Sequence, residues 1–506
     1  MSDRPVRVRF APSPTGPLHI GGVRTALYNY LFAKKNKGTF ILRIEDTDQK
    51  RFVEGAEAYI NQSLDWLGIH VDEGVVQGGP LGPYKQSERM DKYAAYAKQL
   101  VNDGYAYYAF DTPEELNEMR SKLKASNMSA KYDSTSRMSM KNSLTLSEDE
   151  VNERLEHGDN YIIRIKLPRN EEIRFHDVIR GWIVFNSSQL DDKVLLKEDG
   201  LPTYHLANIV DDHLMEISHV IRGEEWLPSA PLHVMLYRYL GWEDTMPKFA
   251  HLPLILKPDG KGKLSKRDGD RLGFPVFPIE WTSPEGDISS GYRESGYLPE
   301  AVVNMLAMLG WHPSDNKELF TLDELVDVFQ LERVSKSGAK FDMDKSKWFN
   351  HQFLMRSNAQ ELKAMIEDQL LPIHTQKGEE YLIQVIDLLK EKVTFPSELL
   401  SMGQYFFDLP SSYDDKVQRK KWNEEVSVHI NAIINGLVQS NLSKASQIEE
   451  YLDNYAEQNE VSKGKLMQPL RWVVSGQAGG PPIFDMLELI GLDEIVKRMR
   501  VVNDKF

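Results

Sequence analysis

The loop from Pro12 to Gly22 has residue types that suit the binding of a phosphate. It contains His19, Gly21 and Gly22, and it precedes a segment with helical patterning. A helix N-terminus presents unpaired N–H groups and a partial positive charge, glycines let a ligand approach the backbone, and a histidine ring can donate to a phosphate oxygen. The loop fits neither the Walker pattern nor GxGxxG. Taken alone, a Pro/Gly-rich loop before a helix is more often only a connection.

A second candidate is the basic loop KLSKR, residues 263–267. Its two lysines, Lys263 and Lys266, lie three residues apart on a Gly-flanked loop that could close over the phosphates of a nucleotide. There they would neutralise charge that develops in a transition state. By itself, a short basic loop is usually solvated surface.

The elements around these loops alternate between strands and helices. Residues 6–10 and 40–44 have the patterning of strands, and residues 23–38 and 56–67 that of helices. This order is typical of βαβ units around a parallel sheet. Strand candidates thin out and then return, and almost everything after Leu298 has helical periodicity. We therefore predict an α/β sheet that is interrupted by an inserted domain and followed by a mostly helical region.

Composition limits the chemistry that the chain can perform. The 506 residues are 41% hydrophobic and 27% charged, which is typical of a globular protein with a sizeable core. Cysteine is absent, which excludes disulfides, thiol nucleophiles, iron–sulfur clusters and thiolate zinc sites. The sequence has no apolar run of about 18 residues and no apolar leader. We expect a cytoplasmic enzyme with no membrane contact.

The net charge of −15 argues at first against a nucleic-acid partner. The charge is unevenly distributed, however. The first 37 residues carry seven lysines and arginines against one acid, Asp3, and further basic residues gather at 257–271 and 333–347. Binding depends on the charge of the surface that contacts the ligand rather than on the net charge. These basic segments are therefore compatible with a polyanionic partner.

Six motifs in order resemble one family. HIGG after the first strand and KLSKR about 240 residues later look like the HIGH and KMSKS signatures of class I aminoacyl-tRNA synthetases. The whole set is similar to bacterial-type glutamyl-tRNA synthetases: RFAPSPTGPLHIGG, RIEDTD, GPYKQSER, LPTYHLANIVDDH, VIRGEEW and KLSKR. The resemblance is densest before Arg267 and weaker after about Asn350.

The resemblance implies four parts. They are a Rossmann-like catalytic domain (1–87 and 210–256), an inserted acceptor-stem-binding domain (88–209), a KMSKS-loop and stem-contact domain (257–345) and an α-helical anticodon-binding region (346–506). The implied activity is ligation of L-glutamate to the 3′-terminal adenosine of tRNA(Glu) through glutamyl-adenylate. ATP would be consumed with Mg²⁺, and such enzymes generally need tRNA before they activate glutamate. We expect a monomer.

The resemblance also implies residue roles. His19, Gly21, Gly22, Lys263 and Lys266 would bind ATP, and His19 and the two lysines would be catalytic. No protein metal site is expected. The positions that match the glutamate site are Arg9, Ser13, Glu45, Tyr204, Asn208 and Arg222, with Glu45 as the natural partner of the substrate ammonium. Arginine suits a carboxylate because its planar fork can bond both oxygens.

Contacts with tRNA are implied at four positions, Arg333 and Lys336 in the stem-contact segment and Lys390 and Lys392 near the anticodon-reading position. These matches leave open whether tRNA(Gln) is charged as well. Some relatives carry a cysteine-rich zinc site in the inserted domain; the corresponding stretch here is GYAYYAFDTPEEL, so no zinc is expected. Residues 274–291 look like an insertion without a derivable role.

Four alternatives remain to be weighed against this interpretation. A glutaminyl-tRNA synthetase is disfavoured by RFAPSPTG and by the helical C-terminal half. A truncated relative that modifies a tRNA base would lack the last third, and small nucleotidyltransferases with HIGH are far shorter. A catalytically inactive tRNA-binding module is excluded only weakly, because intact motifs do not prove turnover.

Overall fold

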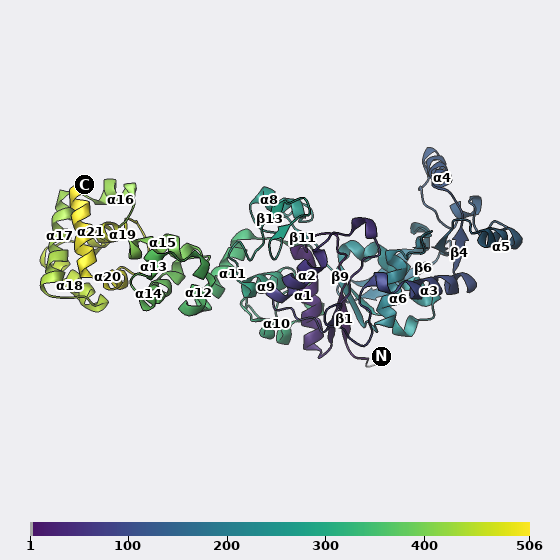
Figure 1. The fold of residues 1–506 in the computed structure, drawn as a ribbon, viewed down its shortest axis with the longest axis horizontal. Coiled ribbons are helices and arrows are strands. Elements are labelled where there is room, and N and C mark those ends of the chain that lie inside the picture. The colour runs from purple at the N-terminus through teal and green to yellow at the C-terminus, as the bar shows by residue number, and fades with distance from the viewer. Residues whose placement is uncertain (1–3) are drawn as a thin grey trace. The chain divides into compact units, whose positions relative to one another are not determined.

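A computed structural model describes residues 4–506, without the side chains of Lys266, Arg267 and Asp270. The chain divides into two compact units (Figure 1). The first contains residues 1–295 and 302–343, and the second contains 296–301 and 344–506. None of the described helices is long and apolar enough to cross a lipid bilayer.

The first unit begins with a parallel sheet in the order β1-β2-β3. Its strands are β1 (Arg7–Phe10), β2 (Thr39–Leu42) and β3 (Glu73–Gly74). Helices α1 (Ile20–Lys35) and α2 (Ala56–Trp66) connect them, as the sequence predicts. All four residues of β1 are buried, the arginines included, because Arg7 pairs with Glu73 and Arg9 pairs with Asp212.

A second sheet has the order β7-β6-β10-β9. Its strands are β6 (Glu172–Asp177), β7 (Gly181–Asn186), β9 (His219–Gly223) and β10 (Lys248–Leu252). β10 runs parallel to β9 along five residue pairs and parallel to the end of β6. Thus β6 and β7, which the sequence places in the inserted segment, extend the sheet of β9 and β10. The backbone N–H of Ser218 donates to the carbonyl of Arg7 and joins the start of β9 to the first sheet.

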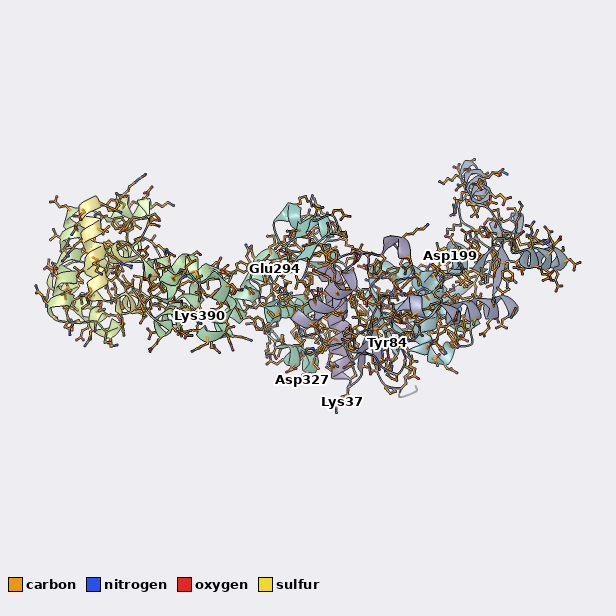
Figure 2. All side chains as sticks on the ribbon, viewed as in Figure 1. Lys37, Tyr84, Asp199, Glu294, Asp327 and Lys390 are labelled. Atoms are coloured by element: carbon orange, nitrogen blue, oxygen red, sulfur yellow. The ribbon has the colours of Figure 1, made fainter. Side chains whose placement is uncertain are left out.

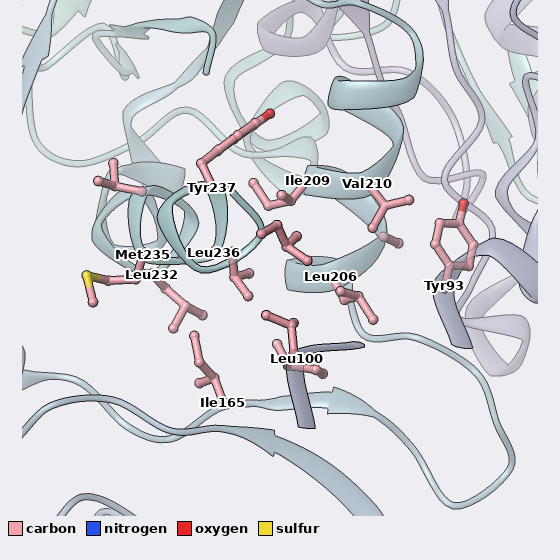
Figure 3. Packing of buried hydrophobic residues seen from close by; sticks show 14 of the residues in the cluster. Tyr93, Leu100, Ile165, Leu206, Ile209, Val210, Leu232, Met235, Leu236 and Tyr237 are labelled. Atoms are coloured by element: carbon pink, nitrogen blue, oxygen red, sulfur yellow. The ribbon is translucent and has the colours of Figure 1, made fainter. Parts of the chain in front are cut away.

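Helix α6 (Tyr204–Leu214) spans the predicted boundary between residues 209 and 210, and the hydrophobic core is continuous across that boundary. Figure 3 shows Leu206, Ile209 and Val210 of α6 packed among Leu100, Leu236 and their neighbours. Fully burying one such side chain contributes about 1.5–3 kcal/mol. This core therefore couples the inserted segment to the rest of the unit. The remaining elements here are α3 (Met90–Asn102), α4 (Pro113–Ala125), α5 (Glu148–His157) and α7 (Ala230–Tyr239), with the antiparallel strands β4 (Ala106–Ala109), β5 (Ile162–Ile165) and β8 (Val194–Leu196).

The suspected insertion at 274–291 contains a short antiparallel hairpin of β12 (Trp281–Thr282) and β13 (Ile288–Ser289). It packs on α2, where the hydroxyl of Tyr59 donates to the carbonyl of Ile279 at 2.5 Å and the Tyr59 ring meets Trp281 edge-on. The rest of this part comprises β11 (Ile255–Leu256), α8 (Lys266–Leu272), α9 (Pro299–Met308), α10 (Leu322–Val328) and β14 (Ala339–Lys340).

The second unit is helical in its described part, as its periodicity predicts. Trp472 is fully buried and its ring lies against those of Tyr413, Trp422 and Phe506. Arg498 is also fully buried; it pairs with Glu494 at 3.3 Å and donates to the carbonyls of Val474 and Asp408, which satisfies its charge and its donors. The helices are α11 (Met343–Arg356), α12 (Ala359–Met365), α13 (Pro372–Thr375), α14 (Glu379–Leu389), α15 (Glu398–Phe407), α16 (Asp415–Lys421), α17 (Glu424–Gln439), α18 (Ala445–Gln458), α19 (Lys463–Ser475), α20 (Ile483–Ile490) and α21 (Leu492–Lys505).

Candidate active site

A cleft of about 1330 Å³ in the first unit brings the predicted catalytic and glutamate-binding residues together. Its walls come from β1 and the loop after it, the start of α1, the loop after β2, helix α6, strand β9 and the KLSKR loop. The predicted residues that line it are Arg9, Ser13, His19, Gly21, Gly22, Glu45, Tyr204, Asn208, Arg222 and Lys263. Lys266 begins α8, but its side chain lies outside the described part of the chain.

His19 caps the N-terminus of α1. Its Nδ1 accepts a hydrogen bond from the backbone N–H of Gly21 at 3.0 Å. A neutral ring that accepts at Nδ1 carries its proton on Nε2. The cap therefore fixes His19 in the tautomer that can donate to an anion through Nε2.

The sequence predicts that the backbone N–H groups at the start of α1 are available to a phosphate. In the structure, three of them already donate to acceptors within the protein. Ile20 donates to the carbonyl of Val276 at 3.0 Å, Gly21 donates to His19, and Gly22 donates to the carbonyl of His19 at 2.8 Å. Gly22 also has a packing role, since a Cβ there would lie 2.7 Å from a methyl group of Leu18. The His19 side chain and the helix dipole thus provide the positive character of this end of the cleft.

Glu45 and Arg9 belong to a buried ion network. Arg43 donates to Glu45 at 3.0 Å and to Asp212 at 2.7 Å, and Arg9 holds both oxygens of Asp212 at 2.9 and 3.2 Å. Asn208 donates to the same oxygen of Glu45 at 3.3 Å. Burial raises the pKa of Glu45, although Arg43 and Arg9 oppose the shift. For Asp212, burial also favours the neutral acid, but Arg9 and Arg43 prevail and hold its pKa below the usual value.

Arg89 and Asp211 form a further buried ion pair beside this network. Arg89 donates to Asp211 at 2.6 Å, and Gln86 and Tyr93 each donate to the other oxygen of Asp211 at 2.8 Å. Together, three arginines (Arg9, Arg43 and Arg89) balance three carboxylates (Glu45, Asp211 and Asp212). Our sequence reasoning did not identify Arg43, Arg89, Asp211 or Asp212 as site residues. Charged side chains inside the apolar runs FILRIED and ANIVDD were a signal for a buried network.

Arg222 has a different environment. Its guanidinium donates to the hydroxyl of Tyr204 at 2.7 Å, to Nε2 of His251 at 3.1 Å and to the carbonyl of Trp226 at 3.3 Å. A longer contact of 3.5 Å leads to Nδ1 of His233. None of these described partners is a carboxylate, and the arginine is 5% exposed. No acid of the described part of the chain therefore bonds directly to Arg222.

Helix α6 places Tyr204 and Asn208 on one face, as their four-residue spacing predicts. Trp226 is 43% exposed and its ring centroid lies 4.5 Å from that of Tyr204, so it belongs to the cleft wall rather than the core. Arg24, by contrast, is buried and donates to the carbonyls of Leu309 and Pro253.

Lys263 reaches across the cleft to an acid of the VIRGEEW motif. Its Nζ lies 2.7 Å from Oε1 of Glu225, and both side chains are about half exposed. The start of α8 is fixed nearby, because Asp268 accepts hydrogen bonds from the backbone and hydroxyl of Ser265 at 2.9 and 2.6 Å. These bonds hold the pKa of Asp268 well below the usual range. The KLSKR loop is thus anchored at one end by a cap and at the other by an exposed ion pair.

The four predicted tRNA-contacting residues lie outside this cleft. In the first unit, Arg333 donates to the carbonyls of His312 and Pro313, and Lys336 is exposed. In the second unit, Lys390 (labelled in Figure 2) lies 2.7 Å from Asp387, and Lys392 is exposed. The guanidinium of Arg333 is committed to the loop that precedes α10, so Lys336 and Lys392 are the more accessible cations.

Comparison with known proteins gives the same assignment along the whole chain. Residues 5–348 match the catalytic domain of class I tRNA synthetases (E and Q), and residues 359–502 match an anticodon-binding domain. A glutamate–tRNA ligase of Cytophaga hutchinsonii is 55% identical over 99% of this chain and 98% of its own length. The glutamate–tRNA ligase of Parabacteroides distasonis is 55% identical over 99% of both chains.

A solved structure agrees. The crystal structure of a glutamate tRNA ligase from Elizabethkingia meningosepticum, in complex with its amino acid, has a TM-score of 0.92 and 48% identity, covering 99% of this chain and all of that one. The fold is accordingly a class I synthetase catalytic domain followed by a helical anticodon-binding domain. The chain belongs to the glutamate–tRNA ligases, the glutamyl members of the class I tRNA synthetases.

Proposed function

We propose that the cleft is where this chain, as a glutamate–tRNA ligase, joins L-glutamate to the 3′-terminal adenosine of tRNA(Glu). In the first step an oxygen of the α-carboxylate attacks the α-phosphorus of ATP and pyrophosphate leaves, which gives glutamyl-adenylate. In the second step a ribose hydroxyl of the terminal adenosine attacks the acyl carbon and AMP leaves. The observation that carries this proposal is that Arg222, in the cleft wall, has no carboxylate among its described hydrogen-bond partners.

The charges of the site are complementary to glutamate. The three arginines and three carboxylates of the buried network pair with one another, whereas Arg222 in the cleft wall has no carboxylate among its described hydrogen-bond partners. Glutamate at neutral pH has two carboxylates and one ammonium, so it brings one negative charge. Glutamine brings none and would set N–H donors against the guanidinium. A site that pairs such groups can reject the wrong analogue by about 10⁴–10⁵.

The geometry of the cleft supports individual contacts with the substrate. Glu45 receives the ammonium, which offsets the unfavourable burial of its carboxylate. Arg9 bonds to Asp212 through Nε and Nη2, so Nη1 remains to donate to a substrate carboxylate together with Ser13. Arg222 and the hydroxyl of Tyr204 bind the other carboxylate, and Asn208 supports Glu45.

The other side of the cleft serves ATP. His19 donates to a phosphate through Nε2, and Gly21 and Gly22 form the wall beside it. Lys263 and Lys266 stabilise the pentacovalent α-phosphate and the leaving pyrophosphate, each contributing about 10²–10³ in rate. Before it can do so, Lys263 must exchange Glu225 for phosphate oxygens. We expect Mg²⁺ to be held by phosphates and water, because arginines already occupy Glu45 and Asp212.

We further propose that Lys336 contacts the tRNA stem, with Arg333 shaping the loop beside it. Lys390 and Lys392 lie in the unit that would read the anticodon. The primary partner is tRNA(Glu), and tRNA(Gln) is a second substrate to be tested directly. We expect the enzyme to act in the cytoplasm as a monomer.

Pyrophosphate exchange tests the central proposal. The reaction is run with glutamate or glutamine, each with and without tRNA(Glu). We expect exchange with glutamate that depends on tRNA and little exchange with glutamine. Exchange with glutamine but not glutamate would contradict the assignment. Aminoacylation of purified tRNA(Gln) in parallel decides the tRNA range.

A further inference from the structure

Three buried side chains on adjacent strands form a chain that ends at Arg222. In the second sheet, Arg222 on β9 is the register partner of His251 on β10, and β10 pairs next with the end of β6, where Asp177 lies. Nδ1 of His251 lies 2.6 Å from Oδ2 of Asp177, and Nε2 of His251 lies 3.1 Å from Nε of Arg222. Asp177 and His251 are completely buried.

The two neighbours of His251 impose one and the same tautomer. The carboxylate of Asp177 can only accept, so Nδ1 must carry a proton. The guanidinium of Arg222 can only donate, so Nε2 must present a lone pair. A doubly protonated ring would set its Nε2–H against the Nε–H of Arg222 and add a second positive charge. Burial favours the same state and lowers the pKa of His251 to about 4, although the carboxylate of Asp177 opposes the shift.

Asp177 is itself firmly held. One of its oxygens accepts from the backbone N–H groups of Ile179 and Arg180 at 3.0 and 2.9 Å, and the other also accepts from the backbone N–H of His251 at 3.1 Å. These bonds and His251 outweigh the effect of burial, so the pKa of Asp177 is lowered. The orientation of His251 is therefore fixed by backbone N–H groups of the turn between β6 and β7 and of β10.

We propose that His251, locked by Asp177, is a positioning residue that aims Arg222 at the substrate carboxylate while leaving its guanidinium without a directly bonded carboxylate of the protein. Arg9 and Arg222 differ in the group that orients each guanidinium. Arg9 is oriented by a carboxylate, Asp212, and shares its charge with it, whereas Arg222 is oriented by a neutral ring. An acid in the place of His251 would orient the guanidinium equally well but would cancel the charge that distinguishes glutamate from glutamine. The inference rests on the proposed role of Arg222 in binding glutamate.

The test uses the full-length enzyme with tRNA, ATP and either amino acid. His251→Leu removes the acceptor for Arg222, and His251→Gln keeps one. Because a hydrogen bond to a charged group is lost, His251→Leu should raise the KM for glutamate about 10- to 100-fold and lower the preference for glutamate over glutamine at least tenfold. The KM for ATP should change less than about twofold, and His251→Gln should stay within about fivefold of wild type.

A matched control comes from the same sheet. His219 lies on β9 with Arg222, contacts Ser218 and Phe32, and is absent from the cleft wall. His219→Leu should leave the KM for glutamate unchanged. An unchanged KM in His251→Leu, while Arg222→Met raises it, would overturn this inference and leave the proposed function standing. An unchanged KM in Arg222→Met would overturn the proposed glutamate site as well.

Nitrogen NMR of the wild-type enzyme determines the tautomer of His251 directly, so it tests the inference even if His251→Leu does not fold. With ¹⁵N-labelled histidine, the signal that disappears in His251→Gln identifies His251. We expect the neutral Nδ1–H tautomer at neutral pH. A ring protonated on Nε2, either as the other tautomer or as imidazolium, would refute the proposed arrangement.

Discussion

Replacing Asp212 with asparagine tests the buried ion network most directly. The carboxylate is 1% exposed and accepts from Arg9 at 2.9 and 3.2 Å and from Arg43 at 2.7 Å. Asparagine keeps the shape but removes the charge and turns an N–H donor toward an arginine. The network would then hold three arginines against two carboxylates.

The expected cost follows from this geometry. Removing one partner of a buried ion pair destabilises a protein by about 3–5 kcal/mol. We therefore expect the thermal transition of the first unit to fall by on the order of 5–10 °C. Because Arg9 loses the group that orients it, the KM for glutamate should rise as well, about tenfold or more.

Differential scanning calorimetry and glutamate-dependent pyrophosphate exchange provide the two measurements. Asp65→Asn, at an exposed position of α2, is the matched control and should change stability by less than about 0.5 kcal/mol. Arg9 and Arg43 hold the pKa of Asp212 below its usual value. Its stabilising effect is therefore present above the ordinary aspartate range and is lost as the pH falls through the lowered pKa. A wild-type transition temperature and an unchanged KM in Asp212→Asn would refute the reasoning.

Three further predictions concern the cleft. Lys266→Ala should lower glutamate activation about 10²–10³-fold with nearly unchanged tRNA affinity, and lost tRNA binding with normal activation would contradict this role. Glu225→Gln should release Lys263 and lower the KM for ATP by up to about fivefold, since an exposed pair contributes about 0–1 kcal/mol; a higher KM would show that Glu225 assists ATP binding. Because burial raises the pKa of Glu45, the KM for glutamate should rise as the pH is lowered toward about 5, and a flat profile would argue against Glu45 as the ammonium partner.

The sequence predicts local elements and individual site positions better than it predicts how they are joined. The four-residue spacing of Tyr204 and Asn208 placed them on one face of a helix, and the structure confirms that helix. The alternation in β1 predicted a strand, but it gave no sign that Arg7 and Arg9 are buried. Their partners Glu73 and Asp212 are distant in sequence, and such pairings depend on tertiary structure alone.

Two other features could not be predicted for similar reasons. The N–H of Ile20 is satisfied by a carbonyl at Val276, which local patterning cannot show. The hydrogen bonds from Asp177 through His251 to Arg222 depend on the order of strands in a sheet. Periodicity identifies a strand but does not say which strands are neighbours.

The strand order of the second sheet also bears on how this enzyme family can be recombined. Asp177 lies in the segment that the sequence predicts as inserted (88–209), yet it sits in the same hydrogen-bonded row as His251 and Arg222. A chimera that exchanges the whole predicted insert would thus import part of the proposed amino-acid site along with the predicted acceptor-stem-binding surface. Exchanges that leave β6, β7 and α6 in place would keep Asp177, Tyr204 and Asn208 together with the rest of the proposed amino-acid site.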